Sequence, residues 1–239
     1  MICKIAELLV DVPEVGDLKS RCRDYTIDLA QKATGADIYI RTERFRPRTK
    51  ELGLDENSYI YLESGIQFTT DVLNHGGLVL HASAVEVGGR AYLFSAPCGT
   101  GKSTHSRMWK AAFGDSVSLF NDDKPVLRFM DGAWYAYGSP WCGKDGININ
   151  KKVKLAGICF LKQAQENKIR RLSTQESVHR MIWQTAHNYA NVRRMDMRLS
   201  LIESVVKKIP IFELENRPEP EAARMSYEAM RCAAEESGI

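Results

Sequence analysis

Residues 96–104 read Ala-Pro-Cys-Gly-Thr-Gly-Lys-Ser-Thr, and our expectations about the fold begin at this loop. The loop follows the pattern G-x-x-x-x-G-K-[ST], with Ala96 in place of the first glycine. The apolar residues 91–95 before it favour a strand, and residues 103–112 after it favour a helix. A strand, this loop and a helix in that order form the arrangement in which such a loop binds phosphate.

The chemistry of the loop lies in its backbone. Consecutive N–H groups point inward around a phosphate, and the following helix adds its positive N-terminal end. Gly99 and Gly101 lack the Cβ atoms that would block a close approach, Lys102 reaches the β- and γ-phosphates, and the Ser103 hydroxyl ligates Mg²⁺. A chance match in a loop is the alternative, and the strand and helix around the motif argue against it. The residues expected to bind ATP are Ala96, Pro97, Cys98, Gly99, Thr100, Gly101, Lys102, Ser103 and Thr104.

Two adjacent carboxylates, Asp122 and Asp123, follow a short apolar strand expected over residues 117–120. One carboxylate can hold Mg²⁺, and the other can accept a proton from an attacking hydroxyl. Adjacent aspartates also suit turns and helix caps, which is the alternative for the pair taken alone. Because the pair comes one helix after the glycine loop, we expect Asp122 to ligate the metal together with Ser103.

His81 differs from the other four histidines, for which the sequence offers no partner. The strand expected over residues 78–85 runs into a hairpin turn at residues 88–89. The hairpin places this strand beside the strand that leads into the glycine loop. We therefore expect His81 to lie near the phosphates.

Hairpins beside a helix crossover predict an α/β protein with a mixed sheet. The pattern further predicts strands at residues 2–10, 36–42, 58–62, 125–130, 134–137, 153–161 and 209–214, and helices at residues 18–31, 67–74, 174–188, 197–208 and 220–235.

Three segments together resemble the HPr kinase/phosphorylase superfamily: Leu-His-Ala-Ser-Ala-Val (80–85), the glycine loop, and Asn-Asp-Asp (121–123). These bacterial serine kinases have a nucleotide core similar to that of phosphoenolpyruvate carboxykinase, and the likeness spans residues 75–145. The resemblance implies a mixed β-sheet P-loop core of that type. It divides the chain into an N-terminal α/β portion packed on the core, residues 1–74, and a kinase-like core with C-terminal helices, residues 75–239.

The resemblance also implies roles for single residues. The family's active-site histidine falls on His81, its loop lysine on Lys102, and the base that activates the acceptor hydroxyl on Asp123, beside Asp122. The stretch Gly138–Lys144 looks like the Pro-Trp-x-Gly-Lys loop of shorter members. Lys144 is therefore a further catalytic candidate that would neutralise the transferring phosphate, and an exposed turn lysine is an equally good interpretation.

The sequence departs from HPr kinases proper in ways that bear on the substrate. The segment before the loop is shorter, Ala96 replaces a glycine, and their substrate-binding signature is missing. We therefore expect an ATP- and Mg²⁺-dependent kinase with a different acceptor, a hydroxyl of a peptide, protein or small molecule. Some short relatives are thought to modify serines of small ribosomally made peptides, which makes such a precursor a candidate. HPr kinases form hexamers, so a homo-oligomer is a further expectation.

Composition bounds the class of protein. The chain has 239 residues, 44% of them hydrophobic, and can bury a sizeable core. Its 33 basic and 30 acidic residues give a net charge of +3, too balanced to argue for a nucleic acid partner. Six cysteines without C-x-x-C spacing predict reduced thiols and a cytoplasmic protein. No window holds the roughly eighteen apolar residues of a membrane span, so we expect no membrane partner.

Two other classes of function remain open at this stage. One is a carboxykinase-type lyase on the same core, which would need further metal ligands and arginines. The other is a nucleotide-binding regulator without catalysis, or an RNA-binding protein. The run of residues 41–50 has five cations and one aromatic residue, which suits a phosphate backbone or an acidic peptide, although such a run is more often a solvated loop.

Overall fold

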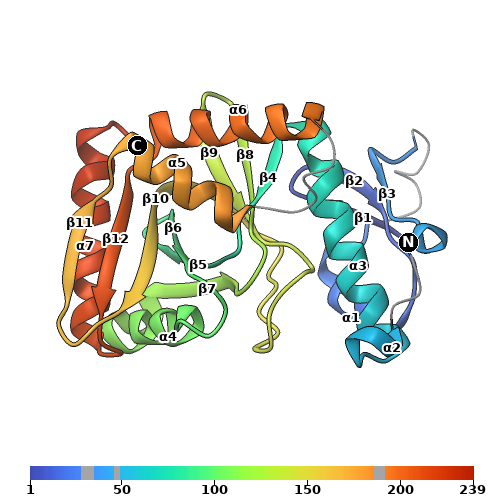
Figure 1. Cartoon of the computed structure of the whole chain (residues 1–239), viewed down its shortest axis with the longest axis horizontal. Helices are drawn as coiled ribbons and strands as arrows, with labels where there is room; N and C mark the ends of the chain where they lie inside the picture. The colour runs from blue at the N-terminus through green and yellow to red at the C-terminus, as the bar shows by residue number, and fades with distance from the viewer. Residues whose placement is uncertain (28–34, 46–48, 186–191) are drawn as a thin grey trace.

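A mixed sheet forms the centre of the molecule (Figure 1). The structure, a computed structural model, describes residues 1–27, 35–45, 49–185 and 192–239. Within these residues the sheet has nine strands. They are β4 (Gly77–Val79), β5 (Ala82–Val87), β6 (Arg90–Ser95), β7 (Val117–Asn121), β8 (Val126–Met130), β9 (Ala133–Tyr137), β10 (Lys152–Gln163), β11 (Lys168–Arg171) and β12 (Ile211–Asn216).

The helices surround this sheet and a smaller N-terminal one, whose strands are β1 (Ile2–Ile5), β2 (Leu8–Asp11) and β3 (Ile38–Tyr39). The α-helices of the described residues are α1 (Gly16–Arg21), α2 (Thr49–Leu52), α3 (Glu56–Asp71), α4 (Lys102–Phe113), α5 (Thr174–Gln184), α6 (Val192–Lys208) and α7 (Pro220–Glu236). Short 3₁₀ turns occupy Arg23–Tyr25, Thr42–Arg44, Val72–His75 and Gly114–Ser116.

The long strand β10 joins two branches of the large sheet. On one side it pairs with β6 along most of its length. On the other side its first residues pair with β9 and its last residues with β12. One branch runs through β9 and β8 to β4, and the other runs from β12 to β11. Beyond β6 the sheet continues through β5 to β7.

Strand direction brings several strand ends to one edge of the sheet. β6, β10 and β12 are parallel, and β5 is antiparallel to both β6 and β7. β7 therefore points the same way as β6, and the carboxyl ends of β7, β6, β10 and β12 lie at one edge. We call this edge the carboxyl edge. The observed pairing confirms the mixed sheet that the hairpins predict.

Alternation along β6 divides the core between the two faces of the sheet. Ala91 and Leu93 belong to the cluster that packs against α5 and α6, whereas Tyr92 and Phe94 belong to the cluster of α4 and α7. Both clusters are almost fully buried. This period of two is what a strand covered by helices on both faces requires.

The N-terminal sheet shares its core with the large sheet. Leu18 of α1 and Phe68 of α3 pack in one cluster with Val79 of β4, Val126 of β8 and Trp141. The ring of Phe68 stacks on that of Trp141 with centroids 4.5 Å apart. Continuous apolar packing therefore joins residues of the first seventy-four to β4, β8 and the loop around Trp141.

Most expected elements are present, but several were predicted with the wrong type or the wrong bounds. The strand predicted at residues 58–62 lies inside α3, because Asp55 caps that helix by accepting from Ser58 N at 3.1 Å. The piece predicted at residues 2–10 is a hairpin, β1 and β2, which turns at Ala6 and Glu7 with positive φ. The helix predicted over residues 18–31 ends at Arg21, and its last four residues lie outside the described ones. The helix predicted over residues 174–188 ends at Gln184, and residues 186–188 also lie outside the described ones.

The strand predicted at residues 78–85 is divided into β4 and β5. β4 pairs with β8, and β5 pairs with β6 and β7, so at Leu80 and His81 the chain passes from the branch of β9, β8 and β4 to the part of the sheet beyond β6. The sequence pattern also missed β11, whose residues are mostly exposed and charged. All six cysteines are free thiols. Among the described helices, none has the length and the apolar character for crossing a bilayer.

His105 lies between the sheet and the helices α4 and α7. Its Nε2 accepts a hydrogen bond from Trp109 Nε1 at 3.2 Å and lies 3.2 Å from Ser226 Oγ of α7. The sequence alone offers no partner for this histidine, because Ser226 is far away along the chain. His105 is thus a core residue of the helix that follows the glycine loop.

We expect His105 to make the native state acid-sensitive. Burial lowers the pKa of His105 from 6.5 to about 3, so the unfolded chain binds a proton that the native state does not. The stability from this group is complete above pH 6.5 and is lost as the pH falls toward 3. When the pH is lowered from about 7.5 to about 5.5, the free energy of unfolding measured with urea should fall by about 1.4 kcal/mol more for the wild type than for His105→Gln. His179→Gln, at an exposed histidine, is the control. Equal losses in wild type and His105→Gln would contradict the prediction.

Candidate functional site

The candidate active site lies at the carboxyl edge of the large sheet. Asp122 and Asp123 follow β7, His81 precedes β5, and the glycine loop follows β6. Since β5 lies between β7 and β6 and is antiparallel to both, all three segments meet at the same edge. The topology thus brings together the three motifs that the sequence analysis singled out.

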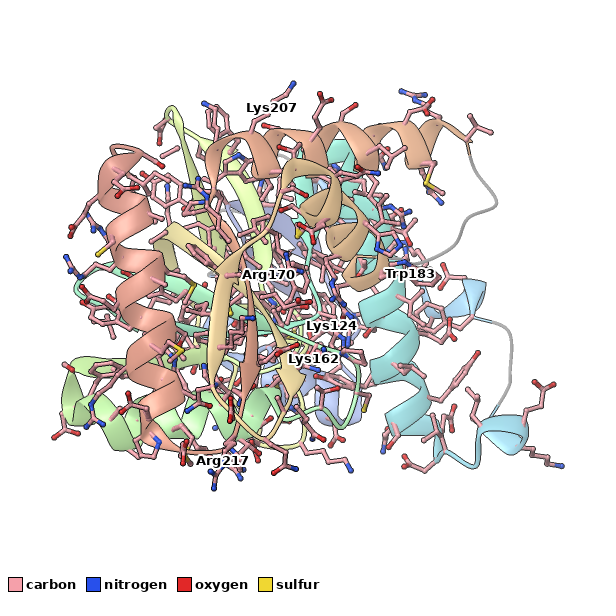
Figure 2. The ribbon with its side chains drawn as sticks, turned by 60° about the vertical axis from the view of Figure 1, so that its left-hand side comes forward. Lys124, Lys162, Arg170, Trp183, Lys207 and Arg217 are labelled. Atoms are coloured by element: carbon pink, nitrogen blue, oxygen red, sulfur yellow. The ribbon has the colours of Figure 1, made fainter. Side chains whose placement is uncertain are left out.

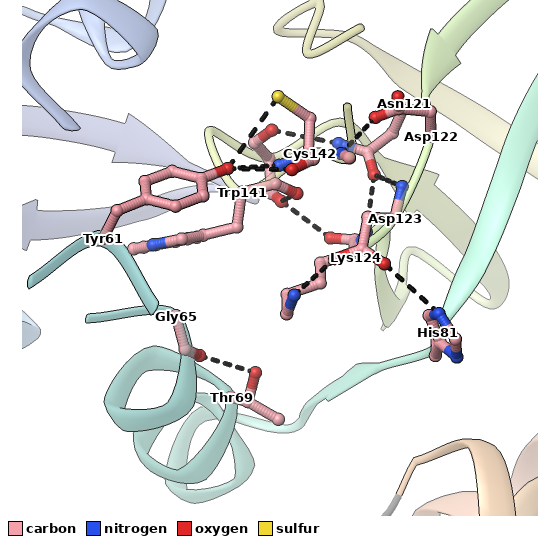
Figure 3. Close-up of polar contacts among 12 residues, drawn as sticks. Tyr61, Gly65, Thr69, His81, Asn121, Asp122, Asp123, Lys124, Trp141 and Cys142 are labelled. Atoms are coloured by element: carbon pink, nitrogen blue, oxygen red, sulfur yellow. Dashed lines mark hydrogen bonds and ion pairs between the residues drawn. The ribbon is translucent and has the colours of Figure 1, made fainter. Parts of the chain in front are cut away.

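A turn built by Asn121 presents the acidic pair. Its Oδ1 accepts from Asp123 N at 3.2 Å and from Lys124 N at 2.8 Å, and its Nδ2 donates to Ser139 O at 3.0 Å. Asparagine is favoured at such turns because its side chain replaces a backbone partner. The turn ends β7 and projects the Asp123 side chain away from the strand (Figure 3).

His81 faces Asp123 because the two chain segments keep one register across the break between β4 and β5. Val79 pairs with Val126 and Ala84 with Asn121, and between them Ala82 N donates to Asp123 O at 3.1 Å. His81 Nε2 lies 3.3 Å from Asp123 Oδ1 (Figure 3).

Gln184 at the end of α5 holds the other side of the imidazole. His81 Nδ1 lies 3.0 Å from Gln184 Oε1, and His81 N donates to Gln184 O at 2.9 Å. Both ring nitrogens of His81 therefore have protein partners. The side chain is fixed in orientation and has no free nitrogen for a further hydrogen bond.

Asp123 is held as a carboxylate. Its Oδ2 contacts Lys124 Nζ in an ion pair, and its Oδ1 faces His81. Burial raises the pKa of Asp123, but the hydrogen bond from His81 and the charge and hydrogen bond of Lys124 outweigh burial and lower the pKa below its ordinary value. The Asp123 side chain is 20% exposed, so it stays accessible from solvent. Two carboxylate oxygens have about four acceptor positions, so Asp123 can accept one more proton donor.

Asp122 is buried and points toward the loop that contains Trp141 and Cys142. Its Oδ1 accepts from Gly143 N at 2.6 Å. Burial raises the pKa of Asp122, and the hydrogen bond from Gly143 counteracts part of this effect. A Cβ at position 143 would lie 3.1 Å from Asp122 Oδ2, so a glycine suits this close contact. A carboxylate with a raised pKa in a buried position is ready to gain from a nearby cation.

The glycine loop has the geometry of an anion cradle. Gly99 and Gly101 have φ of 79° and 110°, and a Cβ at Gly99 would meet no atom within 4 Å. The first hydrogen bond of α4 is His105 N to Gly101 O at 2.8 Å, and among the described residues no side chain caps this N-terminus. The backbone N–H groups of the first turn are therefore available to an anion.

Lys102 is folded back along the loop. Its Nζ donates to Ala96 O at 3.0 Å. Burial lowers the pKa of Lys102, and the negative charge of Asp123 acts in the opposite direction. These residues fit a bound triphosphate, since they offer a lysine, open glycines and free N–H groups in one place.

Residues of the N-terminal portion clamp the loop that holds Asp122 (Figure 3). Tyr61 of α3 accepts from Cys142 N at 2.7 Å and donates to Cys142 O at 3.0 Å. Trp141 Nε1 donates to Ser64 Oγ at 2.9 Å, and Arg21 of α1 contacts the Cys142 sulfur. Because Gly143 is the next residue, α1 and α3 position the N–H that binds Asp122.

We expect Tyr61→Phe to lower the free energy of unfolding by about 1 to 2 kcal/mol, because the substitution leaves Cys142 N without its partner. Urea unfolding monitored by tryptophan fluorescence measures the change. Tyr39→Phe is the matched control, because Tyr39 is exposed and its hydroxyl accepts only from Ala36 N at 3.0 Å among the described residues. The control should stay within about 0.5 kcal/mol of wild type. Equal stability of wild type and Tyr61→Phe would show that the clamp adds nothing.

Lys144 is exposed in the turn after Gly143, and no contact with His81, Lys102 or Asp123 is observed within the described residues. Its neighbour Asp145 forms an ion pair with Arg107 of α4 at 2.7 Å. A catalytic role for Lys144 therefore stays a prediction. Among the described residues no group of three or more His, Cys, Asp or Glu side chains could hold a metal ion.

The sequence analysis did not single out Lys124 or Gln184, which complete the cluster. Lys124 directly follows the acidic pair, and that adjacency is a signal that could have found it. No signal exists for Gln184, which lies 103 residues from His81 along the chain. In the basic run of residues 41–50, Arg41 pairs with Asp11 at 3.2 Å and lies over the Tyr39 ring, and residues 46–48 lie outside the described ones.

The model of one protein family matches residues 64–217, more than half of the chain. The family is described as SynChlorMet cassette protein ScmC. The chain belongs to the ScmC family. The match begins within α3 of this ScmC-family chain and ends just after β12, so it contains His81, the glycine loop, Asp123 and Gln184.

Among solved structures, the ScmC-family chain is similar to the Hpr(Ser) kinase/phosphatase from Coxiella burnetii, at 10% sequence identity and a TM-score of 0.39. The similarity covers 66% of this chain and 98% of that chain. No curated protein matches the chain. The residue roles proposed below rest on the geometry of this chain itself.

Proposed function

We propose that this protein is an ATP- and Mg²⁺-dependent kinase that transfers the γ-phosphate to a hydroxyl, that of a serine in a peptide or protein. One observation carries the proposal. Asp123 follows β7 and the glycine loop follows β6, so a carboxylate and a glycine-rich loop that ends in Lys102 lie at the same carboxyl edge of the sheet. Phosphoryl transfer needs these two functions close together and little covalent chemistry from the protein.

The loop supplies the grip on the donor. We assign residues 96–104 as a P-loop in which the N–H groups of the first turn of α4 and Lys102 bind the phosphate oxygens. The open space beside Gly99 supports close approach of a phosphate. Ser103 and Asp122 would hold Mg²⁺, which neutralises phosphate charge when bound. Gly143 N orients Asp122 for that role.

Asp123 accepts the proton of the acceptor hydroxyl. Its lowered pKa keeps it ionised at neutral pH, and the loose transition state of phosphoryl transfer asks for proton acceptance only late in the reaction. His81 and Lys124 orient the carboxylate from two sides. His81 acts as a positioning group here, because both of its nitrogens are already engaged.

The solvent exposure of the side chains at the site supports a peptide or protein as the phosphate acceptor. The His81 side chain is 34% exposed and the Asp123 side chain 20% exposed. Trp183, next to Gln184 on α5, is 65% exposed and offers an aromatic surface to an incoming peptide (Figure 2). A serine on a flexible segment can reach such an open edge.

Phosphate transfer from γ-labelled ATP with Mg²⁺ into a fractionated lysate of the source cell tests the proposal. The wild type should label a peptide or protein band on serine, as judged by phosphoamino acid analysis, and Lys102→Ala should not. Lys110→Ala is the control, because Lys110 is exposed at the far end of the same helix and pairs with Asp115. Tight ATP binding without transfer to any fraction would instead support a nucleotide-binding regulator.

A further inference from the structure

A cavity of about 710 Å³ lies beside the glycine loop, at the ends of β10 and β12. Asp123 lies at the end of β7, and β5 and β6 separate that strand from β10. The glycine loop therefore stands between the cavity and the proposed phosphate acceptor site. The polar residues that line the cavity include Thr100, Thr104, His105, Gln163, Gln165, Asn216 and Arg217.

The parallel strands create this cavity. β6 ends in the glycine loop, β10 ends at Gln163, and β12 ends at Asn216, all at the carboxyl edge. Gln163 Nε2 donates to Thr100 O at 3.3 Å, and this hydrogen bond connects the end of β10 to the glycine loop. Ligands of open α/β sheets bind outside the carboxyl ends of the strands, which is the position of this cavity.

The distance along the carboxyl edge from Asp123 to the cavity indicates how long a ligand must be to reach both. From β7 to β12 the edge crosses β5, β6 and β10, four strand spacings or roughly 19 Å. A phosphate alone would occupy only the loop. A triphosphate that carries a nucleoside would extend from Asp123 past the loop into the cavity.

Hydrogen bonds hold the turn after β12, and this turn carries a cation. Arg217 N donates to Asn167 Oδ1 at 2.9 Å, and Asn167 Nδ2 donates to Glu219 Oε1 at 2.9 Å. Pro218 further restricts this turn. The Arg217 guanidinium is exposed at the lower edge of the molecule in Figure 2, and it forms no ion pair with another described residue. A planar guanidinium of this kind stacks on an aromatic ring or binds ribose and phosphate oxygens.

We infer that this cavity is the nucleoside subsite of the phosphate donor. The base and ribose lie against Gln163, Asn216 and Arg217, and the phosphates run along the loop toward Asp123. The amide side chains of Gln163 and Asn216 offer donors and acceptors to the edge of a base. The inference rests on the proposed kinase function, and it assigns opposite ends of the edge to the donor nucleoside and to the acceptor.

Equilibrium binding separates this inference from the kinase proposal. Isothermal calorimetry compares ATP, GTP and inorganic tripolyphosphate, each with Mg²⁺, on wild type, Arg217→Ala and Arg171→Ala. Arg171 is the matched control, because it is exposed on β11 opposite the first half of β12, at the other end of the strand from Arg217. We expect Arg217→Ala to weaken ATP about tenfold and to leave tripolyphosphate binding unchanged. Retained tripolyphosphate binding also shows that the variant is folded.

Each other outcome has a distinct meaning. Equal affinity of the wild type for ATP and tripolyphosphate would overturn the nucleoside subsite and leave the phosphate loop intact. An equal loss for both ligands in Arg217→Ala would place Arg217 on the phosphates and also overturn the subsite. No binding of either ligand by the wild type would contradict the kinase proposal itself. Tighter GTP than ATP binding, lost in Arg217→Ala, would support the subsite with guanine as its base.

Discussion

Replacing Lys102 with alanine is expected to abolish phosphate transfer and to weaken ATP binding. Lys102 is partly buried at the start of α4 and is aligned by Ala96 O at 3.0 Å, so its charge is preorganised beside the phosphate-binding N–H groups. Removing such a group from a water-poor site should reduce kcat/KM by about a thousandfold or more. The affinity for ATP should fall by about tenfold, the usual loss for a charged hydrogen bond.

The measurement combines label transfer with calorimetry of ATP binding. Lys110→Ala should behave as wild type in both assays, because that lysine lies at the exposed end of α4. Alanine at position 102 should not destabilise the fold, since burial of the ammonium group is unfavourable in the native state. Full turnover by a folded Lys102→Ala protein would overturn the assignment of the loop.

Asp123→Asn is expected to remove turnover and to leave ATP binding within about twofold of wild type. The amide has the same shape as the carboxylate but does not accept a proton at neutral pH, so kcat should fall about 10² to 10⁴-fold. Lys124 would lose its ion-pair partner, but both side chains reach solvent and the loss of stability should be small.

Single-turnover transfer under saturating ATP measures this effect on the chemical step. Asp115→Asn, at a fully exposed aspartate in the turn after α4, is the control. Wild-type turnover by Asp123→Asn would show that Asp123 is not the base. If His81→Asn were then inactive, His81 would have a role beyond orienting Asp123.

Local sequence determined the elements around the glycine loop. Strand β6, the loop, helix α4 and strand β7 follow from patterns that span a few residues, such as glycines at positive φ and an apolar run that ends at Asn121. These patterns are reliable because turn and helix-start chemistry acts between near neighbours. The Ser58–Leu62 segment shows the limit, because its β-branched and aromatic residues favour a strand while the Asp55 cap starts a helix.

The motifs also identify most residues of the site. Asp122 and Asp123 follow the end of β7, and the glycine loop that leads to Lys102 follows the end of β6, two strand ends that the sequence pattern predicts. His81 lies between β4 and β5, where the sequence pattern predicts one continuous strand. The distances between these side chains are not readable in the sequence. The break between β4 and β5 that turns His81 toward Asp123 depends on pairing with two different strands of the sheet.

The sequence by itself therefore determined the loop, the acidic pair and the mixed sheet of this protein. Only the tertiary structure decided that Gln184 holds His81, that Tyr61 fixes the Cys142–Gly143 backbone that binds Asp122, and that Gln163 and Arg217 line a cavity beside the loop. The physical reason is sequence separation. These contacts join residues tens to more than a hundred positions apart, and their energies depend on packing that no local pattern encodes.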